Sequence, residues 1–175
     1  SNEGHCLFLN NQNIKSDRFV FDECNFITEE KDKKLRKGKL ERGDVVLTTR
    51  GTVGTVAYYD NSVQFDRVRI NSGMLLFRHG GNFEPEFLYK LLASPRMKAV
   101  YKNMGSGSAQ PQLPITSLRQ IKIIKPPKPE QKKIAEILSS VDNKLLISKQ
   151  LKQKLLRLKK GLMQDLLSGS VRVTT

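Results

Sequence analysis

Residues 126–169, PPKPEQKKIAEILSSVDNKLLISKQLKQKLLRLKKGLMQDLLSG, decide the fold of this chain. Proline fits the first turn of a helix but not its interior, so Pro129 is predicted as the first helical residue. Glu130 then places a negative charge beside the positive end of the helix dipole. No proline follows before Gly169, a residue type that commonly ends helices. We predict one helix of roughly 40 residues, about 60 Å long at 1.5 Å per residue.

Apolar residues recur along this helix at spacings of three and four, which is typical of a helix with one apolar face. The expected helix–helix interface consists of Ile134, Leu138, Val141, Leu145, Leu151, Leu155, Leu158 and Leu162. The spacing is irregular around Ser148. A break there or at Gly161, after which the chain folds back, is the alternative to a continuous helix, although a helical glycine costs only about 1 kcal/mol.

Residues 1–125 are too few to cover such a helix. A domain of about 125 residues has a radius of gyration near 14 Å, which corresponds to a sphere roughly 36 Å across. Part of the apolar face then stays in water unless another helix covers it. A two-fold pair of identical chains is the commonest way to cover such a surface, so we expect a homodimer or a second half-subunit joined through this helix.

Both ends of the helix carry distinctive motifs. The start reads Pro126-Pro-Lys-Pro-Glu-Gln-Lys-Lys-Ile-Ala135, and the end reads Lys159-Lys-Gly-Leu-Met-Gln-Asp-Leu-Leu-Ser-Gly169 followed, after Ser170, by Val-Arg-Val173. Over residues 126–173 the chain resembles the conserved region that closes each half of the DNA-specificity (S) subunit of Type I restriction–modification systems. A less specific similarity to the target-recognition domain of that family lies at Arg50-Gly-Thr-Val-Gly54, between two predicted strands.

The resemblance implies the fold and the function. We expect a mixed α/β (α+β) target-recognition domain over residues 1–125, followed by one long C-terminal helix of the coiled-coil type in residues 126–175. The helix would act as spacer, as dimerisation element and as docking site for the methyltransferase subunit. The domain would bind double-stranded DNA and recognise one half of a bipartite target, as the non-catalytic specificity subunit of a complex with methyltransferase (M) and restriction (R) subunits. S-adenosylmethionine and ATP would be bound by those partners and not by this chain.

Composition agrees with a polyanionic partner. The chain has 31 basic and 17 acidic residues, a net charge of +14. The excess is shared evenly, because residues 1–125 hold 20 basic and 13 acidic side chains and residues 126–175 hold 11 and 4. Such a charge attracts nucleic acid. The alternatives are a non-specific nucleic-acid-binding protein, and a basic coiled-coil scaffold that docks on an acidic protein.

The domain is predicted to contain a central hairpin, in which strands 45–50 and 55–59 are joined by a turn with two glycines. Further strands are expected at 6–9, 19–21, 68–70 and 73–78. Helices are expected at 85–92, at 95–104 with Ser94 as its cap, and within the charged stretch 29–42, where Gly38 would end the helix.

DNA contacts are expected from three places in the domain. The candidates are Asn13 and Lys15 in an amide-rich turn, Lys33, Lys34, Arg36 and Lys37 in the charged stretch, and Thr49, Arg50, Gln110 and Gln112 beside the hairpin and in a polar loop. Arg50 either pairs with guanine or holds a phosphate. The alternatives without DNA contact are, in the same order, an ordinary turn, a solvated run of charges and a loop that only connects two elements.

No catalytic or metal site is expected. The only Pro-Pro lies in Lys125-Pro126-Pro127-Lys128 and lacks the Asn or Asp and the aromatic residue of an amino-methyltransferase loop. Two cysteines and two histidines show no metal-ligand spacing. No apolar run has the roughly 20 residues needed to cross a bilayer, so we expect a cytoplasmic protein without a membrane segment. The chain is either a natural half-subunit or one half of a two-domain subunit.

Overall fold

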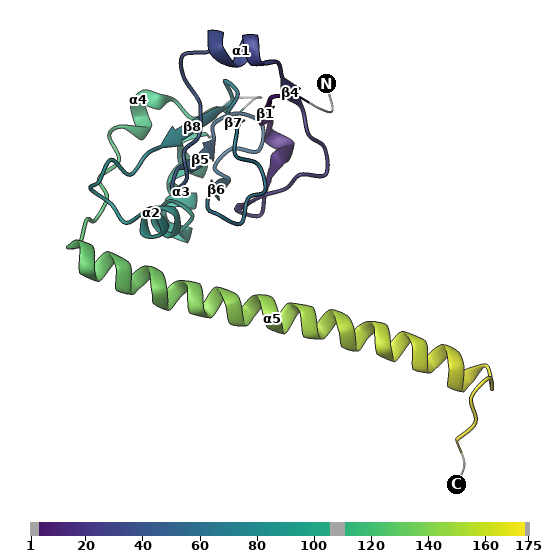
Figure 1. Ribbon diagram of the computed structural model, residues 1–175. Helices are drawn as coiled ribbons and strands as arrows, with labels where there is room; N and C mark the ends of the chain where they lie inside the picture. Colours follow the sequence, from purple (N-terminus) through teal and green to yellow (C-terminus); the bar gives the residue numbers. More distant parts are fainter. Residues whose placement is uncertain (1–3, 106–110, 174–175) are drawn as a thin grey trace. The chain divides into compact units, whose positions relative to one another are not determined.

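The structure is a computed structural model that describes residues 4–105 and 111–173. Its contacts divide the chain into two compact units, Ser1–Ala135, called the domain below, and Glu136–Thr175. The strands and short helices all belong to the domain, and the long helix α5, Lys128–Leu167, begins in the domain and makes up most of the second unit (Figure 1). The mixed α/β fold with a long C-terminal helix is therefore confirmed.

The middle layer of the domain is an antiparallel sheet with the order β6-β5-β8. Its strands are β5, Val45–Thr48, β6, Val56–Tyr58, and β8, Met74–Phe77. All four residues of β5 are buried, although its side chains point alternately to the two faces of the sheet. Both faces are therefore covered, which explains why this strand reads as a continuous β-branched run. The predicted hairpin is confirmed, because β5 and β6 pair antiparallel.

On one face the middle sheet packs against a second sheet with the order β4-β1-β7. In this sheet β1, Cys6–Phe8, runs parallel to β7, Val68–Arg69, and antiparallel to β4, Phe26–Ile27. A separate two-stranded antiparallel sheet is formed by β2, Ile14–Lys15, and β3, Arg18–Phe19, which are joined by a tight turn. The core on this side contains Leu7, Leu9, Ile14, Leu40, Val46, Ala57, Tyr59, Val63, Val68 and Met74.

On the other face the middle sheet is covered by helices α2, Pro85–Leu92, α3, Pro95–Met104, and α4, Ile115–Leu118. The core there contains Val45, Leu47, Val56, Leu88, Leu92, Met97, Tyr101, Leu113 and Leu118. The bounds of α2 and α3 agree with the predicted ones. Ser94 caps α3 as expected, since its hydroxyl accepts a hydrogen bond from Met97 N at 3.3 Å.

Helix α1, Glu29–Lys34, is shorter than predicted and corrects two expectations. It ends before Leu35, and Gly38 lies beyond it, where the chain turns to pair Lys39 with Arg69. The stretch is also not a purely solvated charge run. Asp32 and Arg69 are each only 6 % exposed and form a buried ion pair, so one carboxylate of α1 faces the domain interior.

Helix α5 is continuous over 40 residues, as predicted, and the alternative of a break near Ser148 or Gly161 does not occur. It begins at Lys128, one residue before Pro129, and the chain past its end turns at Gly169 with φ of +75°. The first turns of α5 are packed into the domain. Gln131 is fully buried there, accepting a hydrogen bond from Glu84 N at 2.8 Å and donating one to the Pro126 carbonyl at 2.7 Å. Within the described residues no helix has the length and apolarity needed to cross a membrane.

Candidate nucleic-acid interface

The turn between β5 and β6 carries Arg50 on a backbone that glycines make possible. Gly51 and Gly54 have φ of +70° and +84°, in a region of backbone conformation that is unfavourable for residues other than glycine. The Thr48 hydroxyl holds the turn from inside by accepting a hydrogen bond from Thr55 N at 3.0 Å. The Arg50 side chain is exposed at the end of β5. The sequence pattern thus places a cation at the tip of a hairpin whose strands are buried on both faces.

Three segments distant in sequence converge on the Arg50 main chain. The Gly73 carbonyl accepts hydrogen bonds from Thr49 N at 2.8 Å and from Arg50 N at 3.2 Å. The side-chain amide of Asn11 donates to the Arg50 carbonyl at 2.6 Å. Gln112 forms an antiparallel β-bridge with Arg50. We call Asn11, Arg50, Gly51, Gly73 and Gln112 the recognition cluster.

The amide-rich loop before β2 is a scaffold for this cluster. It folds as the short 3-10 helix η1, Asn11–Asn13, with Asn10 as its cap. Asn13 was expected to contact DNA, and the structure does not support this contact. Its side chain is 1 % exposed and donates hydrogen bonds to the carbonyls of Val20 at 3.2 Å and Glu23 at 2.8 Å, so it is occupied inside the domain. Asn11, which the sequence did not single out, reaches Arg50 instead. No local signal reveals this contact, because 39 residues separate the pair.

The other predicted DNA-contacting residues are placed unevenly around the cluster. Thr49 is only 6 % exposed, so its expected side-chain contact with DNA is not supported and it joins the site through its main chain. Gln112 is exposed beside Arg50. Gln110 lies outside the described residues. Lys15 is exposed on β2 and pairs with Asp22 at 3.9 Å. Among the described residues, no recorded hydrogen bond or ion pair joins the basic residues of α1 to the recognition cluster.

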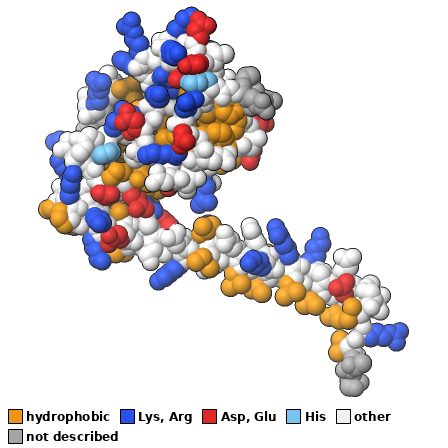
Figure 2. Space-filling view, in the orientation of Figure 1, with side chains coloured by type: hydrophobic (Ala, Val, Ile, Leu, Met, Phe, Trp, Pro, Cys, Tyr) orange, Lys and Arg blue, Asp and Glu red, His pale blue; other side chains and the backbone are white. Residues whose placement is uncertain are grey.

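Several cations of the domain have carboxylate partners. The ion pairs are Lys15–Asp22, Lys33–Glu29, Lys34–Glu30, Arg42–Asp66, Arg69–Asp32, Arg78–Asp44 and Lys98–Asp17. In residues 4–105 and 111–173, by contrast, the side chains of Arg50, Arg36 and Lys37 have neither an ion pair nor a hydrogen bond. In Figure 2 basic and acidic side chains are interspersed over the visible face of the domain. Arg50 is distinguished by the combination of a main chain held by Asn11 and Gly73 with an exposed guanidinium that has no partner among the described residues, and not by a dense basic patch.

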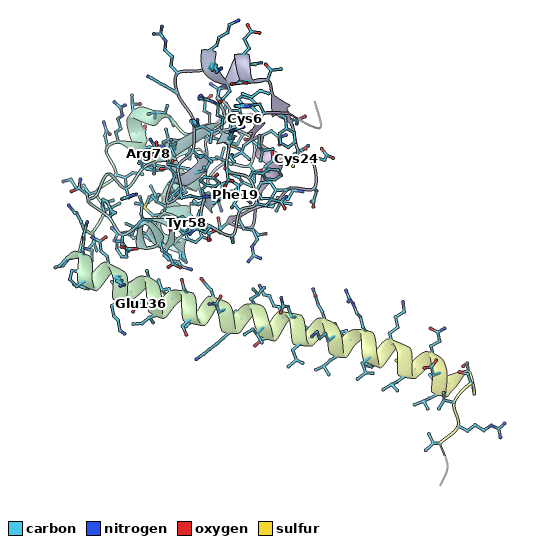
Figure 3. All side chains as sticks on the ribbon, viewed as in Figure 1. Cys6, Phe19, Cys24, Tyr58, Arg78 and Glu136 are labelled. Atoms are coloured by element: carbon cyan, nitrogen blue, oxygen red, sulfur yellow. The ribbon has the colours of Figure 1, made fainter. Side chains whose placement is uncertain are left out.

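Metal-binding side chains are not clustered in the part of the chain that the structure describes. Among the described residues there is no group of three or more His, Cys, Asp or Glu side chains that could hold a metal ion. Cys6 and Cys24 are free thiols within the domain (Figure 3). Burial raises the pKa of the Cys6 thiol to about 11, so it stays protonated near neutral pH.

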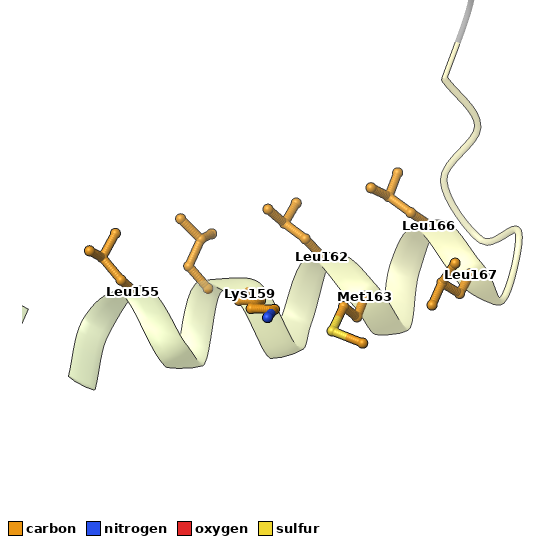
Figure 4. A pocket seen from close by; sticks show the side chains of 7 residues that line it. Leu155, Lys159, Leu162, Met163, Leu166 and Leu167 are labelled. Atoms are coloured by element: carbon orange, nitrogen blue, oxygen red, sulfur yellow. The ribbon is translucent and has the colours of Figure 1, made fainter. Parts of the chain in front are cut away.

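The second candidate surface is the apolar face of α5 in the unit Glu136–Thr175. In Figure 2 its hydrophobic side chains line one side of the helix in view. The predicted interface residues from Leu138 onward are all exposed, from 42 % at Leu138 to 58 % at Leu158. Leu155, Leu158, Leu162 and Leu166 line a surface pocket with Met163, Leu167 and Lys159 (Figure 4). Ile134, at the start of the face, is half-buried.

The sequence from residue 2 to residue 157 matches the model of one protein family, described as the Type I restriction modification DNA specificity domain. This match covers far more than half of the chain and includes both the recognition cluster and most of the apolar face of α5. The chain belongs to this specificity-domain family. The resemblance to this family predicted from the sequence is thereby confirmed.

Curated relatives of this specificity domain come from Methanocaldococcus jannaschii. The putative type I restriction enzyme MjaX specificity subunit is 30 % identical over 166 residues, a match covering 91 % of this chain and 38 % of the relative. The type I restriction enzyme MjaVIII specificity subunit is 28 % identical over 177 residues, covering 96 % of this chain and 40 % of the relative. The chain thus spans about two fifths of the length of these relatives.

Solved structures show the same fold for the specificity domain. The HsdS subunit from Thermoanaerobacter tengcongensis superposes with a TM-score of 0.64 at 19 % identity, covering 91 % of this chain and 41 % of that one. The S subunit of a Type I restriction-modification system from M. genitalium gives a TM-score of 0.56 at 18 % identity, with the same coverages of 91 % and 41 %. The fold is preserved although most side chains differ.

Proposed function

We propose that this chain recognises one half of a bipartite DNA sequence as the specificity component of a Type I restriction–modification complex. Its membership of the specificity-domain family supports the recognition role, and the net charge of +14 supports a nucleic-acid partner. The observation that carries the proposal is Arg50. Its main chain is hydrogen-bonded to Gly73 and to Asn11, and the neighbouring Thr49 carbonyl accepts a hydrogen bond from Leu113 N, while its exposed guanidinium has no partner among the described residues.

An arginine held in this way suits direct readout of DNA. Its planar guanidinium can donate two hydrogen bonds to O6 and N7 of guanine, the commonest specific contact in the major groove. The contact with the base is stronger when the backbone that carries the side chain is already fixed, because less conformational entropy is lost on binding. Arg36 and Lys37, exposed after α1, suit phosphate contacts that position the domain without reading sequence.

The activities of the complex other than recognition would belong to partner subunits. Methyltransferase (M) subunits would dock around α5 and bind S-adenosylmethionine, and restriction (R) subunits would bind ATP. The exposed face of α5 would be covered by the same helix of a second recognition half, either a second copy of this chain or the other half of a longer subunit. The chain itself contributes recognition and spacing.

Replacing Arg50 by alanine tests the base-reading role. We expect Arg50→Ala to lose about 1–3 kcal/mol of discrimination at one base pair while binding to other sequences changes little. Lys33→Ala or Lys34→Ala should weaken all sequences alike, by less, and should reduce the slope of affinity against salt. Both lysines already pair with glutamates one turn earlier, Lys33 with Glu29 at 2.8 Å and Lys34 with Glu30 at 2.5 Å.

The measurement is a comparison of affinities for matched and single-mismatch duplexes at several salt concentrations. Arg50→Lys is the informative companion, because it keeps the charge and loses the bidentate geometry. An equal loss of affinity for every duplex in Arg50→Ala, with full recovery in Arg50→Lys, would show that Arg50 holds a phosphate and would contradict base readout.

A further inference from the structure

Asn11 stands out within the recognition cluster because two glycines surround its side chain. A Cβ atom on Gly51 would lie 2.5 Å from Asn11 Nδ2, a distance that no real Cβ tolerates. A Cβ atom on Gly73 would lie 3.4 Å from Asn11 Oδ1 and 3.6 Å from Arg50 Cβ. A side chain at position 51 would therefore displace the amide from its place beside Arg50, whereas a Cβ on Gly73 would only come into van der Waals contact with it.

The orientation of the Asn11 amide is fixed by its partner. Nδ2 donates to the Arg50 carbonyl, and the reversed amide would set two oxygens against each other. In this orientation Oδ1 is buried and accepts no hydrogen bond from any residue that the structure describes. Leaving a buried acceptor unpaired is destabilising, and such groups are few in folded proteins. Asn11 thus destabilises the fold through its unpaired oxygen, which an apolar side chain would not do, while its amide nitrogen makes one hydrogen bond, to Arg50.

The segment that bears Asn11 is itself fixed. Asn10 and Asn13 form a reciprocal capping box around η1, with Gln12 N donating to Asn10 Oδ1 at 2.8 Å and Asn10 N donating to Asn13 Oδ1 at 2.9 Å. Asn13 in turn holds the Val20 and Glu23 carbonyls. Asn11 therefore projects from a turn held by hydrogen bonds, and displacement of its amide would remove the hydrogen bond to the Arg50 carbonyl.

We propose that Asn11 is a positioning residue for DNA specificity, which sets the direction of Arg50 without contacting DNA itself. The inference rests on the proposed function and deepens it, because it assigns the readout of one base pair to a pair of residues and not to Arg50 alone. Fixing the backbone on which a recognition side chain is carried affects discrimination between bases more than total affinity, since phosphate contacts elsewhere supply most of the affinity.

The test uses the full chain with its methyltransferase partner and a pool of duplexes of random sequence. The unmutated chain first selects its preferred duplex, and affinities are then measured for that duplex and its single-base-pair variants. We expect Asn11→Ala to lose about tenfold in discrimination at the base pair that Arg50→Ala affects, with affinity for random DNA unchanged. Gly51→Ala should lose at least as much discrimination, because its new Cβ would displace the Asn11 amide and its φ of +70° would strain the turn.

The double variant Asn11→Ala/Arg50→Ala decides the mechanism. If Asn11 acts only through Arg50, the double variant discriminates no worse than Arg50→Ala. Asn61→Ala, which removes an exposed asparagine outside the cluster, is the matched control, and thermal melting checks that each variant folds. Unchanged discrimination in Asn11→Ala, or losses that add in the double variant, would overturn the inference alone. Failure of the unmutated chain to select any sequence would contradict the proposed function and this inference together.

Discussion

Leu151→Asp or Leu155→Asp is expected to convert a self-associated chain into monomers while the domain stays folded. Both leucines are 55 % exposed on the apolar face of α5, so neither contributes to a core within the chain. Each would bury its side chain in a helix pair, where a leucine stabilises by about 1.5–3 kcal/mol and an unpaired carboxylate is strongly unfavourable. In a two-fold pair the loss occurs twice, so association should weaken by at least about 100-fold.

The helix favours an antiparallel and imperfect pair. A parallel arrangement would set the basic segments 144–160 side by side, whereas an antiparallel one moves them towards Glu130 and Glu136 of the other helix. The apolar spacing is interrupted at Ser148, near the midpoint of Lys128–Leu167. Two antiparallel helices would therefore bring their irregular regions together, and we expect a seam with a break near its middle.

Light scattering at micromolar concentration measures this directly. The unmutated chain should give twice 19.9 kDa, and either Asp variant should give 19.9 kDa with an unchanged domain melting transition. Gln153→Asp is the matched control, because Gln153 lies about half a helical turn from both leucines and receives the same charge change. A monomeric unmutated chain would contradict self-association and leave the face for the helix of a different recognition half.

Asp32→Ala is expected to cost about 3–5 kcal/mol of unfolding free energy, since it leaves the buried Arg69 guanidinium without its carboxylate. Arg69 Nε donates to Asp32 Oδ1, and its other nitrogens donate to the carbonyls of Asp32 and Lys37 at 2.8 Å each. The pair thereby ties α1 and the following loop to β7. Glu29→Ala on the same helix breaks an exposed pair with Lys33 and should cost about 0.5 kcal/mol or less.

The same pair predicts a loss of stability in acid. The hydrogen bond from Arg69 holds the pKa of Asp32 below its usual value, against the opposing effect of burial. A carboxyl with a lowered pKa in the folded state stabilises fully above its unfolded pKa of about 3.9 and loses that contribution as the pH falls towards the folded pKa. Urea unfolding at neutral pH and at pH 3 should therefore show a smaller acid-induced loss in Asp32→Asn. An equal loss in both proteins would assign the acid sensitivity to other carboxylates.

The elements with strong local signals could be predicted from the sequence. Proline at the first turn and the absence of later breakers give α5 its start and its continuity, and the same signals fix α2 and α3. The buried run of β5 and the two glycines after it define the hairpin. The helix continues through Gly161, although a glycine alone would favour a break there. One glycine costs little beside the many hydrogen bonds of a 40-residue helix.

The candidate site was harder to predict because its contacts are long-range. Asn11 and Asn13 belong to the same polar turn, and only the fold shows that Asn13 points inward while Asn11 reaches Arg50. Asp32 looks like any other charge in its stretch until Arg69 is placed beside it. Arg50 itself could be singled out, since it ends the predicted strand 45–50 and precedes a glycine turn. Which cations lack carboxylate partners depends on the packing of the whole domain.

The central claim, that this chain selects the DNA sequence on which its partners act, is tested most directly by mapping methylated positions in DNA from cells that carry the chain and its methyltransferase subunit. We predict methylation at one motif made of two short parts with a fixed spacing. The motif should be lost when the chain is removed, and one of its base pairs should become degenerate in Arg50→Ala. Methylation of the same motif without the chain, or methylation without any common motif in its presence, would contradict the account.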